Sequence, residues 1–184
     1  MKQSIKGGTI LLAEPFMMDP NFKRAAVLLV DHGEEGGIGF ILNRKTETRI
    51  DELIDDFPEF DAPVYFGGPV GRDTIHFLHC KGDILEGSDE VSHSVFWGGD
   101  FEKLKFLIRQ DLIKPNDIRF FVGYSGWSQN QLDEEIEHGS WVTAPMFANY
   151  LFKSEPAQLW SQVMNNKGNA FSVIADMAEE ASYN

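Results

Sequence analysis

Short apolar runs separated by turn-forming residues fill the first two thirds of the chain. Residues 9–13 and 25–30 are such runs, and continuous apolar stretches of this length are typical of strands buried on both faces. The polar, glycine-rich segment 31–37 then leads into a third apolar run at 38–42, which is a hairpin signal. The chain is therefore predicted to open with β structure.

The same pattern predicts more strands in the middle of the chain. Residues 64–66, 74–79, 95–97 and 118–124 are mainly apolar or aromatic and are bounded by glycine, proline or charged residues. Between the first and second groups of strands, apolar residues recur at helical spacing from position 50 to position 57, and Pro58 ends the pattern. One short helix is expected there.

Asp100 is placed to cap a longer helix whose apolar stripe begins at Phe101. Lys103, Lys105 and Arg109 lie largely off that stripe. They are predicted to form a solvated helix face, with a small basic surface as the alternative.

The last third of the chain is predicted to be mostly helical, with segments at 129–138, 145–152, 156–165 and 170–179. No linker, repeat or low-complexity segment interrupts the sequence. We therefore expect one domain spanning residues 1–184, with an α+β arrangement in which sheet elements come first and helices are concentrated in the C-terminal third.

Charge and cysteine content restrict the function classes. The formal net charge of the 184 residues is -13, so direct binding to DNA is disfavoured, because that binding depends on Lys and Arg displacing counterions. Cys80 is the only cysteine, which excludes an intramolecular disulfide and a cysteine-based zinc site and fits a cytoplasmic protein. No signal peptide or transmembrane stretch is expected, and no membrane association or cofactor is predicted.

Residues 123–127 are predicted to form a strand-to-helix junction. Ser128 and Gln131 have the spacing of a capping box, and Trp127 with Leu132 has the spacing of a hydrophobic staple. Gly123 and Gly126 would free the backbone for a sharp turn, and the unpaired N–H groups at a helix start favour an anion. A binding site at this junction is physically reasonable.

Ser125 in the same segment could act as a nucleophile with His138 or another histidine as base, but the motif is incomplete. A nucleophile elbow needs glycine two residues after the serine, where Trp127 stands. No spacing identifies a matching histidine and aspartate pair, so a serine hydrolase remains the least favoured alternative.

Two other glycine-rich stretches, residues 36–39 and 67–71, do not match nucleotide-binding fingerprints. They are interpreted first as turns, and alternatively as backbone cradles for an anionic ligand near Asn43, Arg44 or Arg72. His76 and His79 lie three positions apart on a predicted strand and so face opposite sides, and no metal site is predicted.

Several segments together resemble a known family. They are residues 8–15, 19–24, 37–44, 65–70, 123–127, 131–132 and 139–141, with the sequences GTILLAEP, DPNFKR, GIGFILNR, YFGGPV, GYSGW, QL and GSW. Taken in this order they resemble the YqgE/AlgH family of bacterial proteins, also called UPF0301, a domain of unknown function. The resemblance implies a mixed fold in which β-sheets, including a small closed barrel, are surrounded by helices. Family members are often labelled transcriptional regulators, and no shared catalytic mechanism comes with the name.

The leading hypothesis is a non-enzymatic binding protein with a cleft for a small polar ligand or a protein segment. The residues expected around that cleft fall at strand ends in three segments: Asn43, Arg44, Gly67, Gly68, Pro69, Tyr124 and Trp127. The second hypothesis, which follows the family label, is a regulator that acts through protein contacts.

Overall fold

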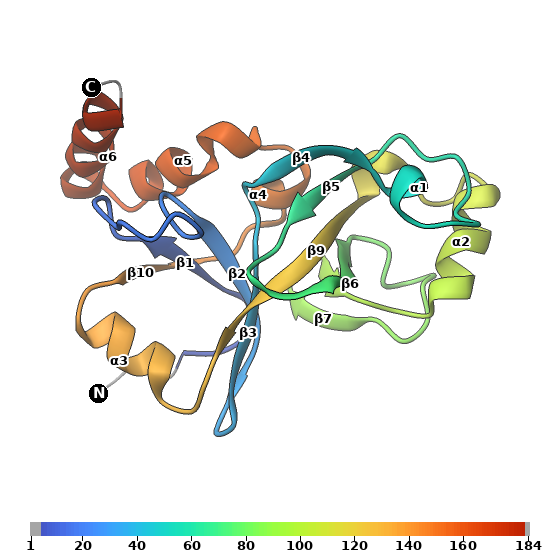
Figure 1. Ribbon diagram of the computed structural model, residues 1–184, viewed down its shortest axis with the longest axis horizontal. Coiled ribbons are helices and arrows are strands. Elements are labelled where there is room, and N and C mark those ends of the chain that lie inside the picture. Colours follow the sequence, from blue (N-terminus) through green and yellow to red (C-terminus); the bar gives the residue numbers. More distant parts are fainter. Residues whose placement is uncertain (1–4, 183–184) are drawn as a thin grey trace.

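The computed structural model describes residues 5–182, which form ten strands and six α-helices with two short 3-10 turns (Figure 1). The strands are β1 Thr9–Ala13, β2 Ala26–Gly33, β3 Gly36–Ile41, β4 Lys45–Arg49, β5 Pro63–Phe66, β6 Val70–His79, β7 Asp89–Ser92, β8 Val95–Trp97, β9 Ile118–Trp127 and β10 Trp141–Pro145. The helices are α1 Ile50–Leu53, α2 Phe101–Arg109, α3 Gln131–Glu137, α4 Ala148–Phe152, α5 Leu159–Asn166 and α6 Asn169–Ser182, and the 3-10 turns are η1 Pro115–Asp117 and η2 Pro156–Gln158.

The strands form one curled sheet in the order β10-β1-β2-β3-β9-β6-β8-β7, and β4 and β5 extend from β9 as a branch. All the pairings are antiparallel except that of β5 with β9. The long strand β9 joins the two halves, because its first part pairs with β5 and β6 and its last part with β3. The mixed α/β class is confirmed. The sheet is a curled half-barrel, and these pairings do not show the small closed barrel that the family resemblance implies.

The first half of the sheet is covered on both faces. Side chains of a strand alternate between faces, so Ile10 and Leu12 of β1 join a core that contains Trp160 of α5. Leu11 joins the opposite core, which contains Leu132 of α3. Figure 1 accordingly shows α5 and α3 on opposite sides of this part of the sheet. The indole N–H of Trp160 donates to the carbonyl of Ala13 at 3.0 Å and ties α5 to β1.

The other half of the sheet has its own core, built with α1 and α2. The Asp100 side chain accepts a hydrogen bond from the Lys103 N–H at 2.7 Å, as expected of a helix cap. The prediction of a solvated basic face is wrong for Lys105, whose side chain is buried. Its ammonium lies 2.9 Å from a Glu102 carboxylate oxygen and 5.4 Å from the centre of the Phe101 ring.

The predicted strand-to-helix junction at residues 123–127 is also wrong, because β9 continues through Trp127 and the helix begins at Gln131. Only one of the two hydrogen bonds of the predicted capping box forms. The Gln131 side chain accepts from the Ser128 backbone N–H at 3.0 Å, but the Ser128 hydroxyl points to that same side chain instead of accepting from the helix. Residue Asn130 supplies the turn with a left-handed φ of 63°.

Four of the six α-helices described in residues 5–182, α3 to α6, follow β9, and α1 and α2 precede it. No helix in that range is long and apolar enough to cross a membrane.

Candidate functional site

Gly67, Gly68 and Tyr124 come together where the chain between β5 and β6 crosses β9. A Cβ added to Gly68 would lie 2.2 Å from the carbonyl carbon of Tyr124, and one added to Gly67 would lie 2.4 Å from the Gly123 carbonyl oxygen. Two backbones approach this closely only when side chains are absent. The glycines are buried and serve this crossing, and Pro69 follows them at partial exposure.

Trp127 lies on the opposite face of the sheet from Tyr124. The two residues are three positions apart on β9, so their side chains point to opposite sides. Tyr124 packs against the core beneath α5, and Trp127 belongs to the core beneath α3. Its indole N–H donates to a Glu135 carboxylate oxygen at 3.0 Å, and Trp141 donates to the same oxygen at 2.7 Å. Trp127 therefore does not share a site wall with Tyr124.

Ser125 is buried, and its hydroxyl donates to the Gly67 carbonyl at 3.1 Å. The ring Nδ1 of His138, the base considered for it, is 2.7 Å from the carbonyl of Glu134 in its own helix. A nucleophile must hydrogen-bond its base and reach the substrate. The contacts of Ser125 give no support to the hydrolase alternative.

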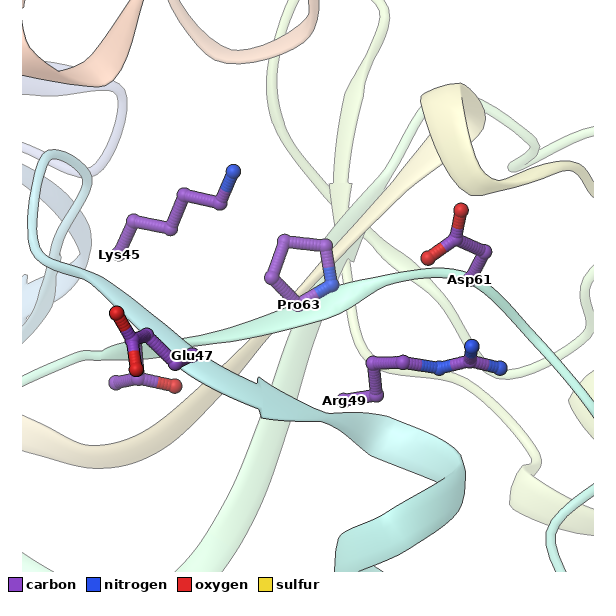
Figure 2. Close-up of a pocket in the computed structure, with 6 residues that line it drawn as sticks. Lys45, Glu47, Arg49, Asp61 and Pro63 are labelled. Atoms are coloured by element: carbon purple, nitrogen blue, oxygen red, sulfur yellow. The ribbon is translucent and has the colours of Figure 1, made fainter.

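A surface hollow of about 480 Å³ lies over β4 and the start of β5. We call it the β4 hollow. Figure 2 shows Lys45, Glu47 and Arg49 along β4, with Asp61 and Pro63 on the neighbouring segment. Charges of both signs line it. The Arg49 guanidinium is held by both carboxylate oxygens of Asp51, and these hydrogen bonds raise the pKa of Arg49. The β4 hollow therefore largely compensates its own charge.

A second hollow, of about 330 Å³, contains two of the residues predicted from the sequence, Asn43 and Arg44. We call it the basic hollow. It lies where the β1–β2 loop meets the chain after β3 and the start of α5. The remaining residues that line it are Pro20, Lys23, Arg24, Ala157 and Trp160. Three cations thus line the basic hollow and no carboxylate does, in a chain whose net charge is -13.

Asn43 holds the β1–β2 loop in place instead of presenting its amide to the hollow. Its side-chain Nδ2 donates to the Arg24 carbonyl at 2.9 Å, and its Oδ1 accepts from the Ala26 N–H at 3.0 Å. The backbone of Arg24 has a φ of 54°, in the left-handed region that costs a side-chain-bearing residue energy. The two hydrogen bonds of the Asn43 side chain, to residues on either side of Ala25, offset that cost.

Arg24 is oriented by α5. Its guanidinium lies over the Trp160 ring, 4.7 Å from the ring centre, and Nη2 donates to the Ser161 hydroxyl at 3.1 Å. Stacking on an indole restricts the orientation of the planar guanidinium. One wall of the basic hollow is thereby a cation in a defined orientation.

Arg44 forms another wall and is half-buried. Its Nη2 donates to the Lys23 carbonyl, and burial lowers the pKa of Arg44 because the charged form loses water. Within residues 5–182, neither Arg44 nor Lys23 forms an ion pair. The hollow therefore has positive charge that no carboxylate of its own wall neutralises.

Arg119 binds the chain just before Asn43. Its guanidinium donates to the Leu42 carbonyl at 3.1 Å and lies 4.2 Å from the centre of the Tyr65 ring. Burial lowers the pKa of Arg119, and interaction with Tyr65 opposes that shift. Its bond to Leu42 fixes the residue directly before Asn43.

The sequence therefore identified one side of the basic hollow and missed the other. Asn43 and Arg44 were named, but Lys23, Arg24 and Trp160 were not. The sequence did contain a signal for Lys23 and Arg24, because they are two adjacent cations in a strongly acidic chain and lie in segment 19–24, which resembles the family. Trp160 gave none, because a tryptophan on a predicted helix is an ordinary core residue.

Comparison with known proteins supports the family resemblance. A family model described as AlgH-like matches residues 10–172. The chain belongs to the AlgH-like family. A UPF0301 protein of Chlorobaculum tepidum is 45% identical over 175 residues, which cover 95% of this chain and 94% of that protein. A UPF0301 protein of Cytophaga hutchinsonii is 36% identical, over 92% of this chain and 93% of that protein.

Solved structures agree with this membership. The solution structure of the AlgH protein from Pseudomonas aeruginosa, 29% identical, covers 95% of this chain and 96% of its own with a TM-score of 0.74. A crystal structure from Corynebacterium diphtheriae, 20% identical, covers 95% and 94% with a TM-score of 0.77 and shows the shared fold alone. The names of these AlgH-like proteins state no activity, so the chemistry of this chain is argued from its own residues.

Proposed function

We propose that this AlgH-like protein is a non-enzymatic binding protein that takes a small anionic molecule in the basic hollow. The observation that carries the proposal is the lining itself, in which Lys23, Arg24 and Arg44 meet without a carboxylate. A cavity of about 330 Å³ is at the lower end of the range for ligand pockets, about 300–1,000 Å³. It suits a small molecule rather than a polymer.

The net charge of -13 does not oppose such a site. Charges farther away than a Debye length, about 8 Å at physiological salt, are largely screened, so a local group of cations dominates its own surroundings. The same net charge does oppose a long polyanion, which would extend over the acidic surface. Direct DNA binding therefore stays an unfavoured alternative, and the expected cytoplasmic location stays a prediction.

The proposed ligand site keeps part of the cleft expected from the sequence. Asn43 positions the loop that carries Arg24, and Arg44 lines the hollow. Gly67, Gly68, Pro69, Tyr124 and Trp127 line neither of the two hollows described above. In our proposal they have no contact with the ligand.

Isothermal titration with pyrophosphate tests the proposal. We expect binding by the intact protein, with affinity reduced at least about tenfold in Lys23→Ala and in Arg44→Gln, because a hydrogen bond to a charged group contributes about 1.5–3 kcal/mol. Lys114→Ala is the matched control, since Lys114 is an exposed lysine near η1, outside the lining of the basic hollow. Equal affinity in all four proteins, or no binding, contradicts the proposal.

A regulator that acts through protein contacts is the second candidate, in line with the family label. One face of α6 supports it, because Val173, Ile174 and Met177 are exposed there, and exposed apolar groups of this kind often mark a contact surface. The test is a pull-down against RNA polymerase and regulator proteins, beside a mobility shift with DNA at low and physiological salt. Capture that survives Val173→Ser and Met177→Ser would count against this surface.

A further inference from the structure

We infer that the basic hollow recognises the dianionic phosphate group of a small phosphate monoester, in preference to a dicarboxylate of equal charge. This inference rests on the proposed function and specifies the chemical class of its ligand. It follows from the number, kind and fixation of the cations in the hollow.

The charge of the lining matches a group with more than one negative charge. Lys23, Arg24 and Arg44 line the hollow, and none of the other lining residues is charged. Within residues 5–182, Lys23 and Arg44 form no ion pair, so a single carboxylate would leave one of these two positive charges uncompensated. A phosphate monoester carries close to two negative charges at neutral pH and concentrates them on three oxygens.

The kind of cation favours phosphate as well. A guanidinium presents five donors in a planar fork that matches the oxygens of a phosphate. Arg44 uses one of its donors within the described part of the chain, in the bond to the Lys23 carbonyl. The remaining donors of a half-buried guanidinium are available to a ligand that enters the hollow.

The two arginines are held before any ligand arrives. Trp160 and Ser161 fix the Arg24 guanidinium, and Asn43 fixes the Arg24 backbone. The Arg44 guanidinium donates to the Lys23 carbonyl. A site whose charged groups are already ordered loses less entropy on binding. Both polar groups of the Asn43 amide are engaged, so charge and fork geometry determine the choice of ligand.

The phosphate ester has two possible sources, a soluble metabolite or a lipid headgroup. The loop that supplies Lys23 and Arg24 also carries two exposed apolar side chains, Phe16 at 61% and Met18 at 89% exposure. Side chains of this kind, on a loop that also binds phosphate, would enter the interface of a membrane. The two sources share the phosphate chemistry and differ in whether Phe16 and Met18 matter.

Titration of the intact protein with sn-glycerol 3-phosphate and with succinate, a dicarboxylate of the same charge, tests the inference. We expect glycerol 3-phosphate to bind at least about tenfold more tightly near neutral pH, and Arg44→Gln to remove most of that difference. The affinity should fall from about pH 7.5 to about pH 5.5, because the second proton of a phosphate ester binds near pH 6. Sulfate, a dianion at both pH values, should show no such fall.

The two proposals fail differently. Equal affinity for succinate and glycerol 3-phosphate, both lost in Arg44→Gln, overturns the phosphate inference and leaves the anion site intact. Absence of binding for every anion overturns both.

Flotation with phosphatidylcholine vesicles, with and without phosphatidic acid, distinguishes the two sources of the phosphate ester. The lipid headgroup is supported if flotation depends on phosphatidic acid and is lost in the double variant Phe16→Ser/Met18→Ser, while glycerol 3-phosphate binding is unchanged. The soluble metabolite is supported if the protein binds glycerol 3-phosphate but does not float with the vesicles.

Discussion

The side-chain amide of Asn43 donates a hydrogen bond to the backbone carbonyl of Arg24, with 2.9 Å between nitrogen and oxygen. This bond connects the chain after β3 to the β1–β2 loop and keeps Arg24 in its left-handed conformation. The basic hollow exists because these two segments are held together. Asn43 is therefore a positioning residue for the proposed ligand site.

Asn43→Ala should lower both stability and anion affinity. The substitution removes two hydrogen bonds and leaves the Ala26 N–H without its partner, so we expect a loss of about 1–3 kcal/mol in the free energy of unfolding. Urea denaturation and pyrophosphate titration measure the two effects. Asn116→Ala, at an exposed asparagine in η1, should change neither. Unchanged affinity in Asn43→Ala would show that the loop does not depend on this residue.

His79 should make stability depend on pH. It is fully buried, Nδ1 accepts from the Lys81 N–H at 3.1 Å, and Nε2 lies 2.8 Å from the Gly98 carbonyl. Burial lowers the pKa of His79, although the bond to Gly98 opposes the shift. The unfolded state therefore binds a proton below about pH 6.5 that the folded state does not bind, so stability falls as pH drops through that value and is constant above it.

Urea denaturation at a series of pH values measures this dependence. His79→Gln should have a shallower slope between about pH 6.5 and about pH 5 than the unchanged protein. A part of the slope should remain, because burial also lowers the pKa of His76. His93→Gln, at an exposed histidine, is the control and should keep the full slope. Identical slopes in all three proteins would refute a neutral buried His79.

Gly68→Ala should destabilise the crossing of the β5–β6 connection over β9. Gly68 has a φ of 154°, and its added methyl group would lie 2.2 Å from backbone atoms of Tyr124, which cannot move without disturbing β9. We expect a loss of at least about 1–3 kcal/mol in the free energy of unfolding. Gly33→Ala has open space around its Cβ and should stay close to the unchanged protein. Equal midpoints in urea would contradict the close approach.

Glu135→Ala should destabilise the core beneath α3. One Glu135 oxygen accepts from both indole N–H groups of Trp127 and Trp141, which are largely buried. Removing it leaves two buried donors unsatisfied, at a cost of about 1–3 kcal/mol each. Glu134→Ala on the same helix, at an exposed glutamate, is the control. Tryptophan fluorescence during urea denaturation follows both variants, and equal stability would mean that water replaces the carboxylate.

The sequence predicted the apolar strands well and the polar ones poorly. The runs at β1, β2 and β3 stand out because both faces of these strands are buried. β4 and β7 were missed because their residues are mainly polar and exposed or half-exposed, at the outer parts of the sheet. β10 was also missed, in a part of the chain predicted to be mostly helical. Turn residues also misled, since Gly123 and Gly126 suggested a junction but lie within β9. Gly123 serves a close backbone approach, since a Cβ there would lie 2.5 Å from the Gly68 carbonyl oxygen, and such an approach has no local signature in the sequence.

The candidate site was predictable only in part for a similar reason. Asn43 and Arg44 sit at a strand end, where polar residues draw attention. Their partners come from two other segments. One is the β1–β2 loop, which precedes Asn43, and the other is α5, which follows it by more than a hundred residues. Contacts of that kind depend on tertiary packing. The sequence alone identified the residues that one segment contributes to the hollow, and only the fold identifies the residues from the other two segments.

An NMR titration of the isotope-labelled protein with sn-glycerol 3-phosphate tests the anion site most directly. The largest amide shifts should fall at Lys23, Arg24, Arg44 and Ala157, around the basic hollow, and should disappear in Arg44→Gln. Lys45, Glu47 and Asp61 in the β4 hollow should change little. Shifts centred on the β4 hollow, or no shifts at saturating ligand, would contradict the proposed site.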